Sequence, residues 1–539
     1  MKRILYAMAL VAVVAMMPAS MSGQKQLKKL MNAEFAISQF YVDSVNEDKL
    51  VEDAIRGMLE QLDPHSSYST PEETRELEEP LEGEFSGIGI QFNMQQDTLY
   101  VIQTIVGGPA ERVGMLAGDR IVQVEDTVIA GMKMRNTRIM KMLRGKKGSK
   151  VNVMVKRRGT AELIPFRITR DDIPLYSIDA TYMADSNTGY VKVSRFGKKT
   201  DDEFNKALSE LSDKGMTQLI IDLTNNGGGY LQTAVELANT FLERGNGIVY
   251  TQGNNSSRYD AKANGRGKLA DDKFKVVVMV DQYSASASEI LAGALQDWDR
   301  AVIVGRRTFG KGLVQRPFRF EDGSMIRLTV ARYYTPSGRC IQKPYTAGDR
   351  EGYEKDIYNR FLDGELANAD SIHLPDSLKY STLKSGRVIY GGGGIMPDVF
   401  VPLDTTEFSD YYRDLVARGT INQYVIDYVD KYRKELSARY ATVADYDRSF
   451  VVDSTMLHDL KLSGMRDSIE FDSVQYVRSK ALIADVVKAL IARDVYADVS
   501  AYNMVINHRD PIFKEALRVI NDDARYRELL SGSRRKSDD

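Results

Sequence analysis

The stretch KVVVMVDQYSASASEILAGALQD, residues 275–297, contains the change of pattern that decides the fold. Its first six residues are mostly apolar and β-branched, which predicts a short strand buried on both faces of a sheet. A polar turn and an apolar run with helical spacing follow, which predicts a helix from about residue 286. Strand, turn and helix together indicate an α/β domain, and the turn carries three alternating serines, Ser284, Ser286 and Ser288.

The same alternation occurs on both sides of this stretch. LIIDL (219–223) predicts a second buried strand, which ends in the turn NNGGG (225–229) before an amphipathic helix over residues 231–242. AVIVG (301–305) predicts a third strand. Strands that alternate with helices imply crossover connections and a largely parallel sheet. Because ligands bind beyond the C-terminal ends of such strands, we expect the glycine-rich and serine-rich turns to lie at that edge.

A serine hydroxyl needs a base before it becomes a useful nucleophile at neutral pH. No histidine lies between residues 66 and 372, so a Ser-His-Asp triad is disfavoured, although folding could bring distant residues together. The nearby alternative is Lys311, whose glycine neighbours allow close approach of the backbone and a low-charge environment. If its segment is extended, Gln315 projects from the same face and could orient the amine.

Among the three serines, Ser286 has the best geometric argument. Ser286 and Glu289 fit the S-x-x-E capping box, which predicts Ser286 at a helix N-terminus. There the N–H of Ala287 could face a developing oxyanion. The alternative, that Ser286 is only a helix cap, is favoured on pattern alone. Ser284 and Ser288 are interpreted as packing or turn residues.

Residues 82–172 show a different pattern of short strands, glycine turns and one amphipathic helix. The order of these elements resembles a PDZ domain, with Gly87, Ile88, Gly89 and Ile90 at the position of the carboxylate-binding loop. Such domains hold the C-terminus of a peptide, which adds a strand to the sheet. The alternative is a small β-rich domain that needs glycine turns for its own folding.

Two further motifs extend the pattern around the serine turn. SASASEILAGALQD followed by GRRTFGKGLVQ resembles the C-terminal processing peptidases, which are PDZ-containing proteases with a serine–lysine dyad. The resemblance spans residues 40–405 and includes these segments: AIRGMLEQLDPHSSY, GYVKVSRF, IDLTNNGGG, YYTPSGRCIQ and GGGGIMPDVFVPLD. It implies a multidomain α/β protein with a ClpP/crotonase-like peptidase core over residues 173–405.

The resemblance also implies roles for individual residues. Ser286 would be the nucleophile, Lys311, 25 residues later as in the family, the general base, and Gln315 the group that orients the lysine. Asp297 would either join the charge relay or make a structural ion pair, with equal weight on the two. The second oxyanion donor would be Gly228 or Gly229.

The composition of the chain argues against several classes of function. With 539 residues, 43% of them hydrophobic and 27% charged, the chain is long enough for several globular domains. A net charge of −2 with interspersed signs does not suggest nucleic-acid binding. A single cysteine, Cys340, excludes an internal disulfide framework, and four scattered histidines without an HExxH motif make a metal site improbable. We expect neither metal nor cofactor.

The two ends of the chain carry no catalytic motif. Residues 1–22 combine Lys2 and Arg3 with an apolar run and small residues, which predicts a cleaved export signal and a place in the bacterial periplasm or cell envelope. Residues 23–81 predict a helical packing or dimerising segment, so a homo-oligomer is a possible state. Residues 406–539 predict a charged, helical packing or oligomerisation region.

Together these features predict an exported serine endopeptidase that binds free protein C-termini through its PDZ domain and cleaves near them. The expected partners are protein or peptide substrates and an activating adaptor. Two alternatives stay open: a catalytically silent PDZ adaptor, and a Ser–Lys hydrolase of small amides or esters. An intact Ser286, Lys311 and Gln315 set speaks against the first, and the PDZ domain speaks against the second.

Overall fold

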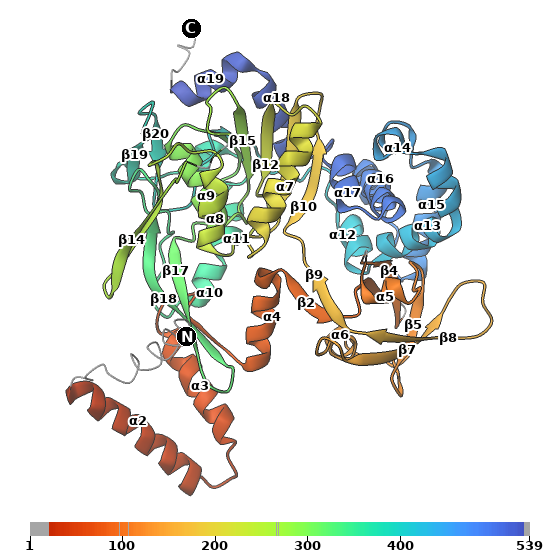
Figure 1. The fold of residues 1–539 in the computed structure, drawn as a ribbon, viewed down its shortest axis with the longest axis horizontal. Helices are drawn as coiled ribbons and strands as arrows, with labels where there is room; N and C mark the ends of the chain where they lie inside the picture. Colours follow the sequence, from red (N-terminus) through yellow and green to blue (C-terminus); the bar gives the residue numbers. More distant parts are fainter. Residues whose placement is uncertain (1–20, 96, 106, 266, 268, 533–539) are drawn as a thin grey trace. The chain divides into compact units, whose positions relative to one another are not determined.

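A computed structural model describes residues 21–95, 97–105, 107–265, 267 and 269–532. The first 20 residues, which carry most of the expected export signal, lie outside the described residues. The chain divides into two compact units, one built from the N-terminal segment with residues 315–329 and 345–353, the other from the rest of the chain after residue 72 (Figure 1). Across the described ranges, no helix is both long and apolar enough to cross a bilayer.

In the first unit, a short strand interrupts the helical segment that the sequence predicts over residues 23–81. Helices α2 (Met21–Phe40) and α3 (Glu47–Glu60) precede a short strand, β1 (Ser67–Ser69). β1 pairs antiparallel with residues 325–327, the start of β18 (Met325–Tyr334). The strand forms because Asp63 folds the chain into a turn, accepting hydrogen bonds from the N–H of His65 at 2.9 Å and from the N–H of Ser66 at 3.1 Å.

The second unit is organised around a six-stranded sheet. The strand order is β10-β11-β12-β15-β16-β21; β10 and β11 are antiparallel and the other neighbours are parallel. The predicted parallel core is therefore confirmed, with a register in which Ile220 pairs with Val277. The strand bounds are Ile178–Met183, Thr188–Val193, Gln218–Asp222, Lys275–Val280, Val302–Gly305 and Val399–Phe400.

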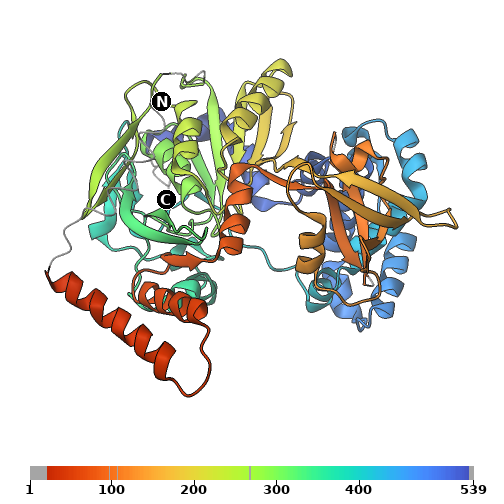
Figure 2. The same ribbon diagram turned by 60° about the horizontal axis from the view of Figure 1, so that its bottom comes forward.

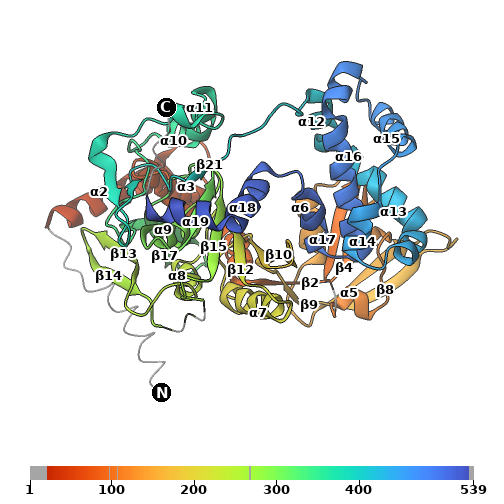
Figure 3. The same ribbon diagram turned by 90° about the horizontal axis from the view of Figure 1, so that it is seen from above.

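Alternate residues of the central strands point to two separate hydrophobic cores. Leu219, Ile221 and Val278 pack with helices α7 (Thr200–Asp213), α8 (Leu231–Asn239) and α9 (Ala287–Asp297). Ile220 and Val277 point the other way, toward α18 (Pro511–Asn521). Figure 3 shows α18 beside β12 and β15. The sequence predicts that the peptidase core ends at residue 405. The structure shows that α18, which lies beyond this bound, also packs on the core sheet.

The chain also contains smaller strands and helices. β13 (Gly247–Gly253) pairs with β14 (Ser256–Lys262) and with the end of β18, where Tyr250 faces Tyr334. β17 (Leu313–Arg319) follows the segment that carries Lys311. The remaining short elements are α10 (Arg350–Glu354), α11 (Asp356–Leu362), η1 (Ala369–Ser371), η2 (Asp376–Leu378), β19 (Lys379–Ser381) and β20 (Val388–Tyr390).

The PDZ-like region has an antiparallel sheet of its own, drawn in orange in Figure 2. Its order is β3-β4-β5-β7-β8, with β6 on β5, and β2 pairs separately with β9. The sequence EFSGIGIQF breaks into β2 and β3 because Gly89 takes a φ of +75°, which ends the extended run. Helix α4 (Pro71–Glu82) precedes this region, and its own helices are α5 (Pro109–Arg112) and α6 (Asn136–Leu143). The strand bounds, β2 to β9, are Glu84–Gly87, Ile90–Gln95, Thr98–Thr104, Arg120–Val124, Thr127–Val128, Lys150–Lys156, Ile164–Thr169 and Asp171–Pro174.

The C-terminal region is helical, as predicted. Its own core holds many tyrosines, among them Tyr446, which stacks on Phe450 with ring centroids 4.6 Å apart. The helices are α12 (Asp410–Ala417), α13 (Thr420–Arg439), α14 (Val443–Ser449), α15 (Ser454–Arg466), α16 (Ser473–Tyr496), α17 (Val499–Ile506) and, after α18, α19 (Asp523–Ser531).

Candidate active site

Ser286 ends the loop that joins β15 to α9, at a backbone conformation that L-residues seldom adopt. Its φ is +56° and its ψ is −113°. Such strain costs on the order of 1–3 kcal/mol and persists only where the surroundings hold it. Here Asp281 holds the loop by accepting the N–H groups of Tyr283 and Ser284, both at 3.0 Å. A strained serine at a strand-to-helix turn is typical of an exposed nucleophile.

The other two serines of the turn are buried in structural hydrogen bonds. The hydroxyl of Ser284 donates to the carbonyl of Leu223 at 2.8 Å, and that of Ser288 donates to the carbonyl of Asn226 at 2.9 Å. Both residues are 0% exposed, whereas Ser286 is only half-buried. Ser284 therefore fixes the serine turn to the chain directly after β12, and Ser288 fixes it to the glycine turn. Of the three serines, Ser286 alone stays partly exposed.

The glycine turn, residues 225–229, packs directly against Ser286. The N–H of Ala285 donates to the carbonyl of Asn226 at 3.0 Å. Gly228 has a φ of +99°, and a Cβ on it would lie 2.8 Å from the Cβ of Ser286 and 2.9 Å from the nitrogen of Ala287. Only glycine fits this position. The two turns meet because β12 and β15 are parallel neighbours, as the sequence predicts.

The predicted oxyanion donors differ in their present hydrogen bonds. The N–H of Gly228 donates to the side-chain oxygen of Asn226 at 2.8 Å. Within the described part of the chain, no hydrogen bond uses the N–H of Ala287, the first residue of α9, or that of Gly229. Ala287 and Gly229 are therefore the two candidate donors that remain open.

Lys311 lies in the loop between β16 and β17, and its main chain is tied to the serine turn. Its N–H donates to Oε2 of Glu289 at 2.8 Å, and the same oxygen accepts the N–H of Ser286 at 2.8 Å. Gly310, with a φ of +85°, would place a Cβ 3.1 Å from the Cβ of Lys343, so the turn before Lys311 needs glycine. The structure thus joins the Ser286 and Lys311 backbones through one carboxylate, while the Lys311 residue itself is half-buried.

Gln315 is the first residue of the segment that belongs to the other unit. There its Nε2 donates to the hydroxyl of Thr329 at 3.2 Å, and Thr329 donates to Asp63 at 2.7 Å. Burial alone would raise the pKa of Asp63, but hydrogen bonds from Ser66, Thr329 and His65 outweigh it and lower the pKa. Asp63 therefore stays an ionised acceptor, and this chain of bonds fixes the orientation of the Gln315 amide.

Asp297 lies at the opposite end of α9 from Ser286. The helix has 11 residues and so extends about 16 Å. The carboxylate pairs with the guanidinium of Arg339 at 2.7 Å, and both side chains are 0% exposed. It also accepts the N–H of Ser337 at 2.8 Å. Of the two roles expected for Asp297, these contacts favour the structural ion pair.

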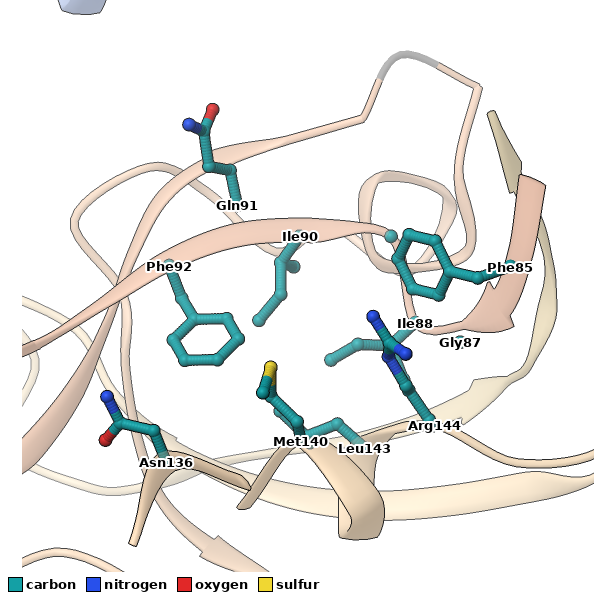
Figure 4. Close-up of a pocket in the computed structure, with 11 residues that line it drawn as sticks. Phe85, Gly87, Ile88, Ile90, Gln91, Phe92, Asn136, Met140, Leu143 and Arg144 are labelled. Carbon is teal, nitrogen blue, oxygen red and sulfur yellow. The ribbon is translucent and has the colours of Figure 1, made fainter. Parts of the chain in front are cut away.

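The PDZ-like region contains an apolar groove of about 400 Å³ between β3 and α6. Figure 4 shows its lining side chains, which include Ile88, Ile90, Phe92 and Met140. In the described residues, the N–H groups of Ile88 and Gly89 make no hydrogen bond. A Cβ on Gly89 would lie 3.0 Å from Ile173, so this glycine lets the loop approach its neighbour. The four predicted loop residues, Gly87 to Ile90, all line the groove.

Sequence reasoning missed the charged end of this groove. Arg144, directly after α6, lies over the ring of Phe85 with its guanidinium carbon 4.5 Å from the centroid. Its guanidinium also pairs with Glu79 at 2.5 Å. The only feature of the sequence that could have indicated Arg144 is its place directly after the amphipathic segment NTRIMKML, residues 136–143. Across the described ranges, no three His, Cys, Asp or Glu side chains are grouped to hold a metal ion.

Family models match four segments of the chain. Peptidase family S41 matches residues 187–357, and the PDZ domain matches residues 86–165. The N-terminal domain of the activating protease CtpB matches residues 10–74. A family of unknown function matches residues 411–498.

Individual relatives match more than half of the chain. A carboxy-terminal-processing protease of Bartonella bacilliformis is 36% identical over 325 residues, covering 59% of this chain and 73% of the relative. Carboxy-terminal processing protease CtpA of Bacillus subtilis is 34% identical over 323 residues, covering 60% of this chain and 68% of the relative. The solved photosystem II D1 C-terminal processing protease is 31% identical, with a TM-score of 0.34, and the match covers 58% of this chain and 89% of that one.

Proposed function

The chain belongs to peptidase family S41 as a carboxy-terminal processing serine protease with a PDZ domain, and on this premise we propose that Ser286 and Lys311 are its catalytic pair. The observation that carries the proposal is the single carboxylate of Glu289, which joins the backbones of these two residues. The strained, half-buried position of Ser286 at the start of α9 supports its role as the nucleophile.

The mechanism needs only groups of this chain and water. Lys311 as the neutral amine takes the proton of the Ser286 hydroxyl while the oxygen attacks the scissile carbonyl carbon. The N–H groups of Ala287 and Gly229 stabilise the oxyanion of the tetrahedral intermediate. Lys311 then gives its proton to the leaving amine, and the carbonyl–nitrogen bond breaks. Water, deprotonated by Lys311, hydrolyses the acyl-enzyme and restores both residues.

Two of the four histidines, His65 and His508, have partners away from Ser286, which supports a lysine base. The ring Nε2 of His65 lies 3.0 Å from the hydroxyl of Tyr353, within the first unit. His508 pairs with Asp447 at 2.7 Å in the C-terminal region. Gln315 is proposed to orient the Lys311 amine with the carbonyl end of its amide, since the amino end is held by Thr329.

We propose that the groove in the PDZ domain binds the free C-terminus of a substrate. β3 lies at the edge of its sheet, so a peptide can add to it as a further strand. The open N–H groups of Ile88 and Gly89 would face the terminal carboxylate, and Arg144 supplies positive charge at the same end of the groove. The apolar lining favours an apolar last residue.

The N-terminal segment supports proposals on location and assembly. The pattern of residues 1–22 supports export to the periplasm or cell envelope. Helix α2 exposes several large apolar side chains, among them Leu27, Met31, Phe35 and Phe40. A second copy of the chain is the proposed occupant of this face, which would make the protease a homo-oligomer, and an activating adaptor is a further proposed partner. Sedimentation of the mature protein with and without residues 23–46 tests the oligomer.

One assay tests the catalytic proposal against its alternatives. The mature protein is incubated with an unfolded substrate that has a free apolar C-terminus and with the same substrate amidated. Cleavage of the free form that is lost in Ser286→Ala and in Lys311→Ala is the expected result. Peptide binding without cleavage would favour the silent adaptor. Hydrolysis of small esters, with no cleavage of either protein substrate, would favour the small-molecule hydrolase.

A further inference from the structure

Two buried side chains outside the proposed catalytic pair each bridge the serine turn and the lysine loop. The first is Glu289, which is 0% exposed. Its Oε2 accepts the N–H groups of Ser286 and Lys311, both at 2.8 Å. Its Oε1 accepts the hydroxyl of Thr308 at 2.5 Å and the N–H of Gly310 at 2.7 Å. Every hydrogen-bonding partner of this carboxylate thus belongs to the serine turn or to the lysine loop.

The second bridge is the hydroxyl of Tyr333, on β18. It donates toward the carbonyl of Ser286 at 3.0 Å and also contacts the carbonyl of Lys311. The N–H of the same residue donates to the carbonyl of Gly312 at 3.0 Å, and the residue is 1% exposed. One hydroxyl proton shared by two carbonyls holds their oxygens close together.

We propose that Glu289 and Tyr333 are positioning residues that together set the separation of Ser286 and Lys311. Glu289 joins the two residues through their N–H groups, and Tyr333 joins them through their carbonyls. The inference rests on the proposed function, because the separation matters for turnover only if Lys311 takes the proton of Ser286.

The physical reason is the short range of proton transfer. A general base acts within hydrogen-bond reach of the proton that it removes. A misplacement of about 1 Å can cost about 100-fold in rate. The two residues lie 25 positions apart and on different loops, so their backbones share no local geometry. One bridge through the N–H groups and a second through the carbonyls restrict the movement of one loop against the other more than either bridge alone.

The first test is Tyr333→Phe, which removes the bridging hydroxyl and keeps the ring. Its matched control is Tyr334→Phe, the next residue on the strand, whose ring stacks on Tyr250 with centroids 4.8 Å apart. We expect kcat to fall between about 10-fold and 100-fold in Tyr333→Phe, with KM and the melting temperature near wild type. Tyr334→Phe should keep the wild-type kcat. The proposal is overturned if Tyr333→Phe keeps the wild-type kcat. It is also overturned if the loss of kcat is fully explained by the share of the variant that is unfolded.

The second test is Glu289→Gln, in which an NH2 group replaces one acceptor oxygen. Its matched control is Glu203→Gln, because Glu203 also accepts several donors, from Ser177 and Ile178, away from both loops. The readout is the rate at which a fluorophosphonate labels the active-site serine. If both bridges hold Ser286 and Lys311 at the same separation, the double variant Glu289→Gln/Tyr333→Phe should be labelled about as slowly as the slower of the two single variants. Losses that multiply in full would contradict a joint role.

Ser286→Ala and Lys311→Ala separate this inference from the proposed function. If Lys311→Ala still labels at the wild-type rate, the lysine base is wrong, whatever Tyr333→Phe does. If Lys311→Ala abolishes labelling while Tyr333→Phe and Glu289→Gln label normally, the catalytic pair stands and the positioning role fails.

Discussion

The serine site and the PDZ groove are both built where a glycine-containing loop meets another element, yet their surroundings differ. Around Ser286 the neighbouring side chains are buried and polar, and Glu289, Ser284 and Ser288 all bond to main-chain groups. Around Ile88 and Gly89 the lining is apolar and open to solvent. The first site is therefore held rigidly by hydrogen bonds, and the second is shaped by packing.

This difference matches the kind of charge that each site would meet. An oxyanion exists only during the reaction, so a rigid site that stabilises it raises kcat. A peptide carboxylate is charged before it binds, so the groove contributes equally to the bound substrate and to the transition state, and it lowers KM. Variants at the two sites should thus separate into kcat effects and KM effects.

The largest expected effect is that of Ser286→Ala. Removal of a nucleophile typically costs on the order of 10⁴-fold or more in kcat. Peptide affinity of the PDZ groove, measured by fluorescence anisotropy, should stay at its wild-type value. Ser209→Ala, an exposed serine on α7, is the matched control and should leave kcat unchanged. A large loss of peptide affinity in Ser286→Ala would break the separation of the two sites.

Lys311→Met should follow, with a kcat loss between about 10²-fold and 10⁴-fold, the usual contribution of a general base. In the wild type, kcat should rise with pH, because only the neutral amine accepts the serine proton. Stopped assays over a range of pH measure this profile. The result that would falsify the lysine base is a profile that stays flat from acidic to alkaline conditions.

Much of the geometry of the candidate site could be predicted from the sequence. The buried strands at 219–223 and 275–280, together with the parallel connection, place the glycine and serine turns at one edge, and the structure confirms this. The helix start at Ser286 was also predictable from Glu289 three residues later. These features follow from local periodicity and capping, which a sequence displays directly.

Other features depend on contacts between distant segments, and the sequence pattern did not contain them. The capping box explains why Glu289 bonds to Ser286, but nothing local indicates that it also bonds to Lys311. The helical pattern of residues 406–539 could not reveal that α18 covers the core sheet. The interruption at β1 likewise depends on pairing with residues 325–327, far along the chain.

Asp297→Asn tests whether a buried charge of the core contributes to stability or to catalysis. Asp297 and Arg339 form an ion pair in which both side chains are 0% exposed, and breaking such a pair typically costs about 3–5 kcal/mol of unfolding free energy. Urea unfolding should show this loss, while kcat per folded molecule stays at the wild-type value. Asp213→Asn, an exposed aspartate at the end of α7, is the control. A kcat loss of about 100-fold without destabilisation would instead assign Asp297 to the charge relay.

Arg144→Gln should have the smallest effect and should act on the PDZ groove alone. A hydrogen bond to a charged group contributes about 1.5–3 kcal/mol, so affinity for a peptide with a free C-terminus should fall by about tenfold or more. Affinity for the amidated peptide, which lacks the carboxylate, should hardly change. Arg138→Gln, on α6 but outside the groove lining, controls for the lost charge. Because Arg144 would meet a charge that is already present in the substrate, its loss should raise KM and leave kcat unchanged; a fall in kcat would mean that the groove also helps to align the serine site.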